Sequence, residues 1–175
     1  MNIRATTPRD IDAIMAIIEE ARSTIAALGI NQWQNGTPNR AMITEDMALG
    51  QGRVVTTDEG EIVGTFAVIY TGEPAYDIIT DGAWLAPDLD GDGAVAYIAI
   101  HRVAISLAHR GNGISADIVC YAESFARILG KSSLRIDTHE GNVVMRRMLE
   151  KNGFMRCGTV YLANGDPRVA YEKVL

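Results

Sequence analysis

The sequence has few cysteines and no long apolar run, which argues against a disulfide-rich protein and against a membrane-spanning one. Its 175 residues include only Cys120 and Cys157, which are far apart and lack the spacing of metal ligands. We expect two ordinary thiols in a reducing cytoplasm and no disulfide framework. No run of 18 apolar residues is present, which argues against a membrane-spanning helix, and the N-terminus lacks the apolar core of a signal peptide. With 47% hydrophobic residues, the chain is predicted to form a single domain over residues 1–175.

Positive charge is missing from the middle of the chain. Residues 54–101 contain nine carboxylates and no lysine or arginine, whereas residues 102–175 contain 11 basic and 7 acidic residues. This distribution suits an anion-binding second half and a cationic partner for the first half, although two ordinary solvated surfaces explain it equally well. No basic stripe with interleaved aromatic residues occurs, so neither a nucleic acid nor a membrane is expected as a partner.

Turn residues and hydrophobic periodicity divide the chain into strands and helices. A short strand at Ile3 precedes a helix that begins with Thr7 as N-cap and Pro8 in its first turn and ends at Gly29. Residues 71–93 form a loop rich in glycine, proline and aspartate, of a length typical of functional or mobile segments. The other expected elements are a helix over 39–50, strands over 53–57, 61–70 and 95–105, a helix over 116–129, a strand over 133–138, a helix over 141–152 and a hairpin of strands over 154–162 and 168–174.

The segment Arg110-Gly111-Asn112-Gly113-Ile114-Ser115 connects the strand over 95–105 to the following helix. Glycines permit close backbone approach and a helix N-terminus carries partial positive charge, so the segment predicts a cradle of N–H groups for a phosphate. It is not a P-loop, because no Gly-Lys-Ser/Thr follows. Gly111, Gly113 and Ala116 also fit the spacing of a dinucleotide fingerprint, with Asp137 near the position of its ribose-binding acid, so a dehydrogenase stays open as an alternative.

Two short motifs resemble those of a known family. Arg110-x-x-Gly113-x-Ser115 resembles the (Gln/Arg)-x-x-Gly-x-(Gly/Ala) acyl-CoA signature of the GNAT N-acetyltransferase superfamily, with Ser115 where Gly or Ala is usual. Asn142, followed by the pair Gly153-Phe154, resembles that family's second motif. The order of the expected elements also matches, so the resemblance covers nearly the full length. It implies an α/β fold in which helices flank a mixed, mostly antiparallel sheet with one parallel pair of strands at the cofactor site.

The resemblance implies an acetyl-CoA-dependent N-acetyltransferase. The pantetheine arm of acetyl-CoA would lie along Val103, Ala104 and Ile105 and against Asn142, and the N–H groups of residues 110–115 would hold its pyrophosphate. A primary amine of a small molecule or peptide would attack the thioester directly, without an acyl-enzyme, and a homodimer is implied as well. Leu149 stands where the family often has a tyrosine that protonates the departing thiolate. A non-catalytic acyl-CoA sensor on the same fold therefore stays open as a second alternative.

The attacking amine needs a proton acceptor, because an alkylamine has a pKa of about 10.4. His101 is the first candidate, since the alternation of side chains along a strand places it on one face with Val103 and Ile105. Asp137 and His139, at the end of the next strand, are the second candidates. The structural alternatives are a half-buried strand histidine for His101 and turn or capping roles for Asp137 and His139.

Aromatic and acidic residues in the loops are the candidates for the acceptor pocket. Trp33, Glu73, Tyr76 and Trp84 carry the rings and carboxylate that bind a cationic amine by cation–π and charge contacts. Packing against the core is the alternative role of the two tryptophans. The acidic composition of residues 54–101 favours a positively charged amine.

A run of aspartates resembles the first half of a calcium-binding loop. It spans Asp88 to Gly93, and the position that requires a bidentate glutamate is occupied by Ala99 in a predicted strand. We therefore expect a solvated acidic loop and no metal site.

Overall fold

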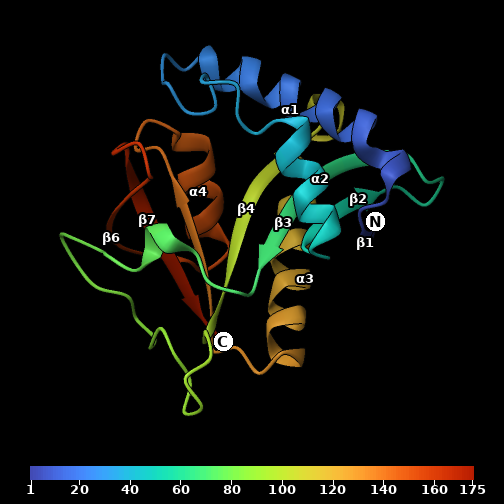
Figure 1. Cartoon of the computed structure of the whole chain (residues 1–175). Coiled ribbons are helices and arrows are strands. Elements are labelled where there is room, and N and C mark those ends of the chain that lie inside the picture. Colours follow the sequence, from blue (N-terminus) through green and yellow to red (C-terminus); the bar gives the residue numbers. More distant parts are fainter. The chain divides into compact units, whose positions relative to one another are not determined.

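The computed structural model describes all 175 residues as a mixed α/β protein (Figure 1). Seven strands form a mostly antiparallel sheet in the order β1-β2-β3-β4-β5-β7-β6, together with four α-helices, which confirms the predicted fold class. The strands are β1 (Asn2–Ala5), β2 (Gly52–Thr56), β3 (Ile62–Ile69), β4 (Tyr97–Ile105), β5 (Ser133–Thr138), β6 (Met155–Tyr161) and β7 (Pro167–Val174). The helices are α1 (Ile11–Ala26), α2 (Arg40–Ala48), α3 (Ile114–Ile128) and α4 (Val143–Lys151). None of these helices combines the length and apolar character that crossing a membrane requires.

The chain divides into two compact units, which are described separately. The first unit comprises Met1–Val68 and Arg102–Ile118, and the second comprises Ile69–His101 and Val119–Leu175. Both units are discontinuous in sequence, because the chain passes from one to the other within β3, β4 and α3. The single domain over residues 1–175 stays a prediction.

The first unit buries one face of α1 against its strands. Strand β2 pairs antiparallel with both β1 and β3, and this gives the helix an apolar surface on which to pack. The apolar residues of α1 recur at helical spacing, as expected for an amphipathic helix. The buried cluster consists of Ile11, Ile14, Ile17, Ile18, Ala21, Ile43, Val54 and Ala104.

The predicted cap residue lies one turn ahead of α1: Thr7 is the N-cap of a 3₁₀ turn, and Asp10 is the N-cap of α1. Pro8–Asp10 forms a single 3₁₀ turn, and the buried carboxylate of Asp10 accepts hydrogen bonds from the backbone N (2.7 Å) and the hydroxyl (2.8 Å) of Thr7. Arg4 donates to both carboxylate oxygens of Asp10, at 2.7 and 2.9 Å. The hydrogen bond from Arg4, followed by those from Thr7, lowers the pKa of Asp10 to about 2. This carboxylate therefore favours the folded state only while it is ionised.

The second unit contains the parallel pair of strands that the resemblance implied. Strands β4 and β5 are parallel, with Tyr97 opposite Ser133, whereas β7 pairs antiparallel with both β5 and β6. The predicted C-terminal hairpin is confirmed, and Gly165 in its turn has a φ of +86° that favours glycine. Polar side chains of β5 and β7 are thereby brought opposite one another across the sheet.

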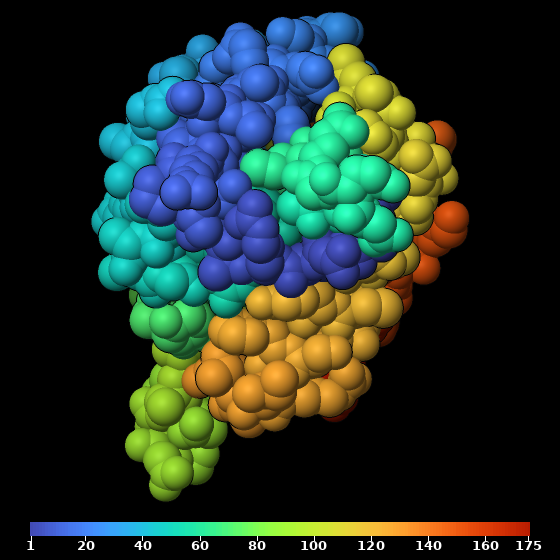
Figure 2. Space-filling view, turned by 90° about the vertical axis from the view of Figure 1, so that its right-hand side faces the viewer, coloured from blue at the N-terminus to red at the C-terminus, as the bar shows by residue number.

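The segment over 71–93 has more local structure than its composition predicts. It contains a single-turn 3₁₀ helix, Pro74–Tyr76, whose N-cap is Glu73: the Glu73 carboxylate accepts from the backbone N of Ala75 at 3.2 Å. Isolated β-bridges join Thr80 to Thr159 and Leu89 to Val95. Residues 88–93 are exposed and form the yellow-green projection at the lower edge of Figure 2. The loop is therefore held at several points, and its acidic tip is a continuous exposed stretch.

Strand β4 contains an interior residue with a left-handed backbone. Arg102 has a φ of +56°, and its guanidinium binds both carboxylate oxygens of Asp46 at 2.6 Å. A positive φ in a bulky residue is rare, and no feature of the strand sequence signals it. This left-handed residue interrupts the alternation of side chains along β4. The sequence argument that His101 lies on the same face as Val103 and Ile105 therefore no longer applies.

Candidate active site

The predicted phosphate loop has the conformation of an open backbone cradle. Gly111 and Gly113 have φ values of +85° and +81°, and no atom lies within 4 Å of a Cβ built at either position. The carbonyl of Gly113 accepts hydrogen bonds from the N–H groups of Ala116 (2.8 Å) and Asp117 (3.2 Å), which closes the first turn of α3. Ile114 is buried and anchors the helix, whereas Arg110, Gly111, Asn112 and Gly113 are exposed. The loop that precedes this 15-residue helix is therefore open to solvent, as an anion site at a helix start requires.

The residues predicted to contact pantetheine lie at the end of β4, in the same unit as the loop. Ala104 is buried in the core, and Val103 and Ile105 are half-buried. The chain then leaves the strand through Ser106, whose N–H donates to the carbonyl of Val63 at 2.9 Å. Their role toward pantetheine stays a prediction.

Five residues predicted for catalysis and acceptor binding gather in the second unit. We call them the acceptor cluster: Glu73, Tyr76, Trp84, His101 and Asp137. His101 Nε2 lies 3.0 Å from Glu73 Oε2, and both side chains are largely buried, with 18% and 24% of their surface exposed. The ring of Tyr76 is stacked on the imidazole of His101, with 5.8 Å between centroids. Residues from a loop and two strands thus meet around one histidine.

Tyr76 is the centre of this cluster. Its side chain is only 1% exposed, and its hydroxyl donates to Asp137 Oδ1 at 2.8 Å. Burial, and then the charge of Asp137, raise the pKa of Tyr76 well above its ordinary value. Tyr76 therefore stays protonated near neutral pH and acts as a hydrogen-bond donor to Asp137. The indole N–H of Trp84 donates to the Tyr76 carbonyl at 3.0 Å, with the two rings 5.2 Å apart.

His139 and Asn142 have local roles at the start of α4. The backbone N of Gly141 donates to His139 Nδ1 at 3.0 Å, which is the turn role considered as the alternative for this histidine. Asn142 is the N-cap of α4, and its side-chain oxygen accepts from the backbone N of Met145 at 3.2 Å. One polar atom of each side chain therefore makes a local structural hydrogen bond. The proposed roles of His139 in catalysis and of Asn142 in cofactor binding stay predictions.

Trp33 is partly buried against the core of its unit, and Leu149 is fully buried in its own unit. Trp33 belongs to the first unit, where it packs against the α1 core and its carbonyl accepts from Arg22 Nε at 3.1 Å. Leu149 is 1% exposed, on α4 of the second unit. Trp33 therefore belongs to a different unit from the other acceptor candidates, and its role toward the acceptor stays a prediction. Leu149 presents no surface to a ligand.

A pocket of about 240 Å³ adjoins the acceptor cluster in the second unit. Its volume is a little below the ~300 Å³ at which typical small-molecule sites begin, and three of its nine lining residues are carboxylates. Tyr97 adds an aromatic ring whose hydroxyl accepts from the backbone N of Glu73 at 3.0 Å. The lining residues are Thr71, Gly72, Glu73, Pro74, Asp77, Asp88, Leu89, Val95 and Tyr97. Carboxylates beside apolar and aromatic walls suit a small organic cation.

Comparison with known proteins identifies the family. Residues 15–154 match the family model described as the acetyltransferase (GNAT) family. The chain belongs to this family. A GNAT-family acetyltransferase from Streptococcus agalactiae is 38% identical and has a TM-score of 0.81, with 99% of this chain and 95% of that chain covered. A GNAT-family acetyltransferase from Listeria monocytogenes is 22% identical, with a TM-score of 0.73 and coverage of 99% and 94%, and shares the fold. A search of curated proteins found no match.

This GNAT protein is an acetyl-CoA-dependent N-acetyltransferase, which confirms the predicted enzyme class and co-substrate. The residues of the loop fit the pyrophosphate of acetyl-CoA, because the two left-handed glycines leave open space where side chains would stand. When bound, acetyl-CoA supplies the activated acetyl group as a thioester. The individual residues that bind it stay predictions.

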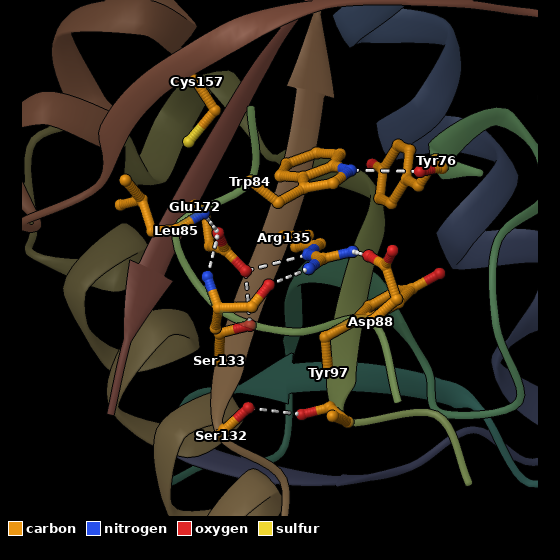
Figure 3. Close-up of polar contacts among 12 residues, drawn as sticks. Tyr76, Trp84, Leu85, Asp88, Tyr97, Ser132, Ser133, Arg135, Cys157 and Glu172 are labelled. Carbon is orange, nitrogen blue, oxygen red and sulfur yellow. Dashed lines mark hydrogen bonds and ion pairs between the residues drawn. The ribbon is translucent and has the colours of Figure 1, made fainter. Parts of the chain in front are cut away.

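The GNAT enzyme also has a buried ion pair that the sequence analysis missed. Arg135 and Glu172 are both fully buried, and Arg135 Nε lies 2.8 Å from Glu172 Oε1 (Figure 3). The two residues are 37 positions apart and directly opposite each other on β5 and β7. The one signal in the sequence is a charged residue at an inward position of each strand, and such residues are rarely buried without a partner. Knowledge of the strand pairing is needed to recognise them as a pair.

Proposed function

We propose that this GNAT enzyme acetylates a primary amine of a positively charged small molecule or peptide, with His101 as the general base. The observation that carries the proposal is the distance of 3.0 Å between His101 Nε2 and Glu73 Oε2 in a largely buried setting. A histidine beside a carboxylate is an arrangement that suits general base catalysis.

In this mechanism His101 takes the proton that the amine must lose. Because Nε2 faces Glu73 at 3.0 Å, we assign proton transfer to Nδ1, with the Glu73 carboxylate beside the ring. Glu73 is itself fixed, since it caps the 3₁₀ helix and its backbone N donates to Tyr97. Stacking of Tyr76 on the imidazole limits rotation of the ring. The proton that His101 took passes to solvent. The neutral amine then attacks the thioester carbon, and its nitrogen releases a second proton to solvent as the amide forms.

The carbon–sulfur bond breaks with CoA leaving as a thiolate. A thiol with a pKa of about 8.5 is a tolerable anionic leaving group, so the reaction proceeds without an acid at Leu149 and solvent protonates the thiolate afterwards. Direct transfer also agrees with the chemistry of Cys157. Burial, and then the charge of Glu172, raise the pKa of Cys157 to about 11, so this thiol stays protonated and is a poor nucleophile.

The charge of the acceptor is inferred from the pocket beside the cluster. Glu73, Asp77 and Asp88 line it, and no lysine or arginine does. A positive charge on the acceptor would be attracted to Glu73 and Asp77, since Asp88 and the Tyr97 ring already contact the guanidinium of Arg135. We therefore expect cationic amines to be better substrates than neutral amines of equal size.

The test is steady-state release of CoA thiol with a panel of amines, for the wild type and for His101→Gln. Loss of a general base lowers the rate about 10²- to 10⁴-fold, and the affinity for acetyl-CoA should stay unchanged. His139→Gln is the comparison variant, because the Nδ1 of this histidine already accepts from Gly141. A large loss in His139→Gln together with full activity in His101→Gln would transfer the role of base to His139.

Acceptor charge is tested with Glu73→Gln and paired amines that differ in charge. The variant should lose activity toward a cationic amine more than toward a neutral amine of the same length. Equal turnover of the two amines by the wild type, with no change of preference in Glu73→Gln, contradicts the proposed substrate class.

A further inference from the structure

The ion pair of Arg135 and Glu172 ties an exposed loop to the centre of the second unit. Glu172 Oε1 accepts from Arg135 Nε (2.8 Å) and from the Ser133 hydroxyl (2.6 Å), and Oε2 accepts from the backbone N of Leu85 and of Ala86. Leu85 is 48% exposed, whereas Glu172 is completely buried. A buried carboxylate therefore binds the backbone of a surface loop (Figure 3).

Arg135 binds the same loop with its remaining donors. Its Nη2 donates to the carbonyl of Ala86 at 2.8 Å, and its Nη1 donates to the carboxylate of Asp88 at 2.6 Å. All three guanidinium nitrogens thus have a partner in the loop or in Glu172. The planar fork of arginine is suited to such a set of contacts, and a lysine ammonium is not.

The guanidinium also contacts two aromatic rings of the active-site region. Its carbon lies 4.3 Å from the ring centroid of Trp84 and 4.2 Å from that of Tyr97, and Figure 3 shows Arg135 between the two rings. Both distances are within the range of cation–π contact. Tyr97 and Asp88 also line the 240 Å³ pocket, so Arg135 contacts two residues of the pocket wall.

A chain of contacts leads from this ion pair to the proposed base. Trp84 donates its indole N–H to the Tyr76 carbonyl, and the Tyr76 ring is 5.2 Å from Trp84 and 6.1 Å from Tyr97. Tyr76 is in turn stacked on His101. The position of the Tyr76 ring therefore depends on Trp84 and Tyr97, whose own positions depend on Arg135.

We propose that the Arg135–Glu172 pair is a positioning element of the acceptor site: it fixes Trp84, Tyr97 and Asp88, and through them the pocket wall and the Tyr76–His101 stack. The proposal rests on the proposed function of His101. A contribution to stability alone does not account for the pair, because well-packed apolar residues often replace buried ion pairs without loss of stability. Apolar replacements would leave the backbone N–H groups of Leu85 and Ala86 and the carboxylate of Asp88 without these partners.

The test uses the double variant Arg135→Met/Glu172→Met, which removes both charges and leaves neither of them unpaired. We expect KM for the amine to rise about 10- to 100-fold, with a smaller change in kcat and unchanged acetyl-CoA affinity, because misplacement of positioning groups by about 1 Å costs up to about 10²-fold. Arg135→Lys keeps the charge but loses the fork and the planar stacking, so it should fold and still show the raised KM. Wild-type KM in both variants overturns the proposal.

A spectroscopic measurement separates this proposal from the proposed function. The chain has two tryptophans, so a Trp33→Phe background leaves Trp84 as the reporter. In that background the Arg135 variants should change the emission and quenching of Trp84, whether or not any amine is turned over. Absence of thiol release from the wild type with all amines refutes the proposed function. Unchanged Trp84 fluorescence in a folded double variant refutes the positioning role.

Arg127→Met is the matched control for these measurements. Arg127 pairs with Glu123 on the exposed surface of α3, with 57% of its side chain accessible. Its loss removes an arginine–glutamate pair that touches neither the loop nor the aromatic rings. Wild-type KM and wild-type Trp84 emission are expected.

Discussion

Substitution of Gly113 by alanine tests whether the open loop before α3 is the acetyl-CoA site. Gly113 has a φ of +81°, and no atom lies within 4 Å of a Cβ built there. The new methyl group therefore meets no neighbour, and the whole effect of the substitution arises from the backbone. An L-residue in the left-handed region is strained by about 1–2 kcal/mol.

The backbone strain of the alanine variant lowers either its free energy of unfolding or its affinity for acetyl-CoA. If the alanine loop keeps its conformation, the free energy of unfolding falls and the affinity for acetyl-CoA is unchanged. If the loop relaxes in the free protein, binding must restore the strained conformation and becomes weaker. Because Gly113 is exposed and its surroundings are open, we expect relaxation. At about 1.4 kcal/mol for each factor of ten, the dissociation constant of acetyl-CoA should rise about 5- to 30-fold.

Calorimetric titration with acetyl-CoA and with CoA measures this change, and a thermal melt detects the other outcome. Gly91→Ala is the control, since Gly91 also has open space around its Cβ position but no positive φ. Both ligands should lose affinity equally for Gly113→Ala, because they share the pyrophosphate. Unchanged affinity together with an unchanged melting temperature for Gly113→Ala would refute the reasoning, as would an equal loss of affinity in Gly91→Ala.

Two further predictions concern stability. Asp10 is 4% exposed and its pKa is lowered from 3.8 to about 2, so its ionised form contributes about 2 kcal/mol above pH ~4, and this contribution is lost as the pH falls through 2. Urea unfolding of Asp10→Asn should show this loss at neutral pH and a much smaller difference from the wild type near pH 2; a constant difference at both pH values contradicts the assignment. Leu149→Tyr places a larger side chain at a site that is 1% exposed, which should cost about 1–3 kcal/mol in a denaturant titration and bring no increase in kcat. A faster and equally stable Leu149→Tyr variant would show that the position reaches the reacting thiolate.

The order of elements was predictable from hydrophobic periodicity and from turn residues at the element ends, and the resemblance to the GNAT superfamily then implied the fold class. Asn39 and Thr7 mark helix starts, and Gly165 marks a hairpin, through local chemistry that does not depend on the rest of the chain. The left-handed backbone of Arg102 was not predictable in this way. Its conformation accompanies an ion pair with Asp46, a partner 56 residues distant that only the folded chain brings near.

Residue chemistry was enough to select most members of the acceptor cluster, but not to show that they lie together. Glu73, Tyr76, Trp84 and Asp137 were chosen for their chemistry, and the structure brings them together with His101 because loop 71–93 folds back over β4 and β5 within the second unit. Trp33 was chosen by the same criterion; it is partly buried against the core of the first unit, and its acceptor role stays a prediction. The pairing of β5 with β7 supplies the missing information for residues such as Arg135.

Neither compact unit is encoded by one uninterrupted stretch of the gene. The chain enters the second unit after Val68, leaves it after His101 and returns after Ile118, so a cut at any single peptide bond leaves at least one unit incomplete. Transfer of residues 69–101 alone between two related chains would need two crossovers, one on either side of the segment. The transferred segment would contain Glu73, Tyr76, Trp84 and His101. Arg135 and Glu172, which we propose position Trp84, would come from the chain that receives the segment. We therefore expect such a transfer to succeed only where the residues of β5 and β7 in the receiving chain can make the same contacts with the new loop.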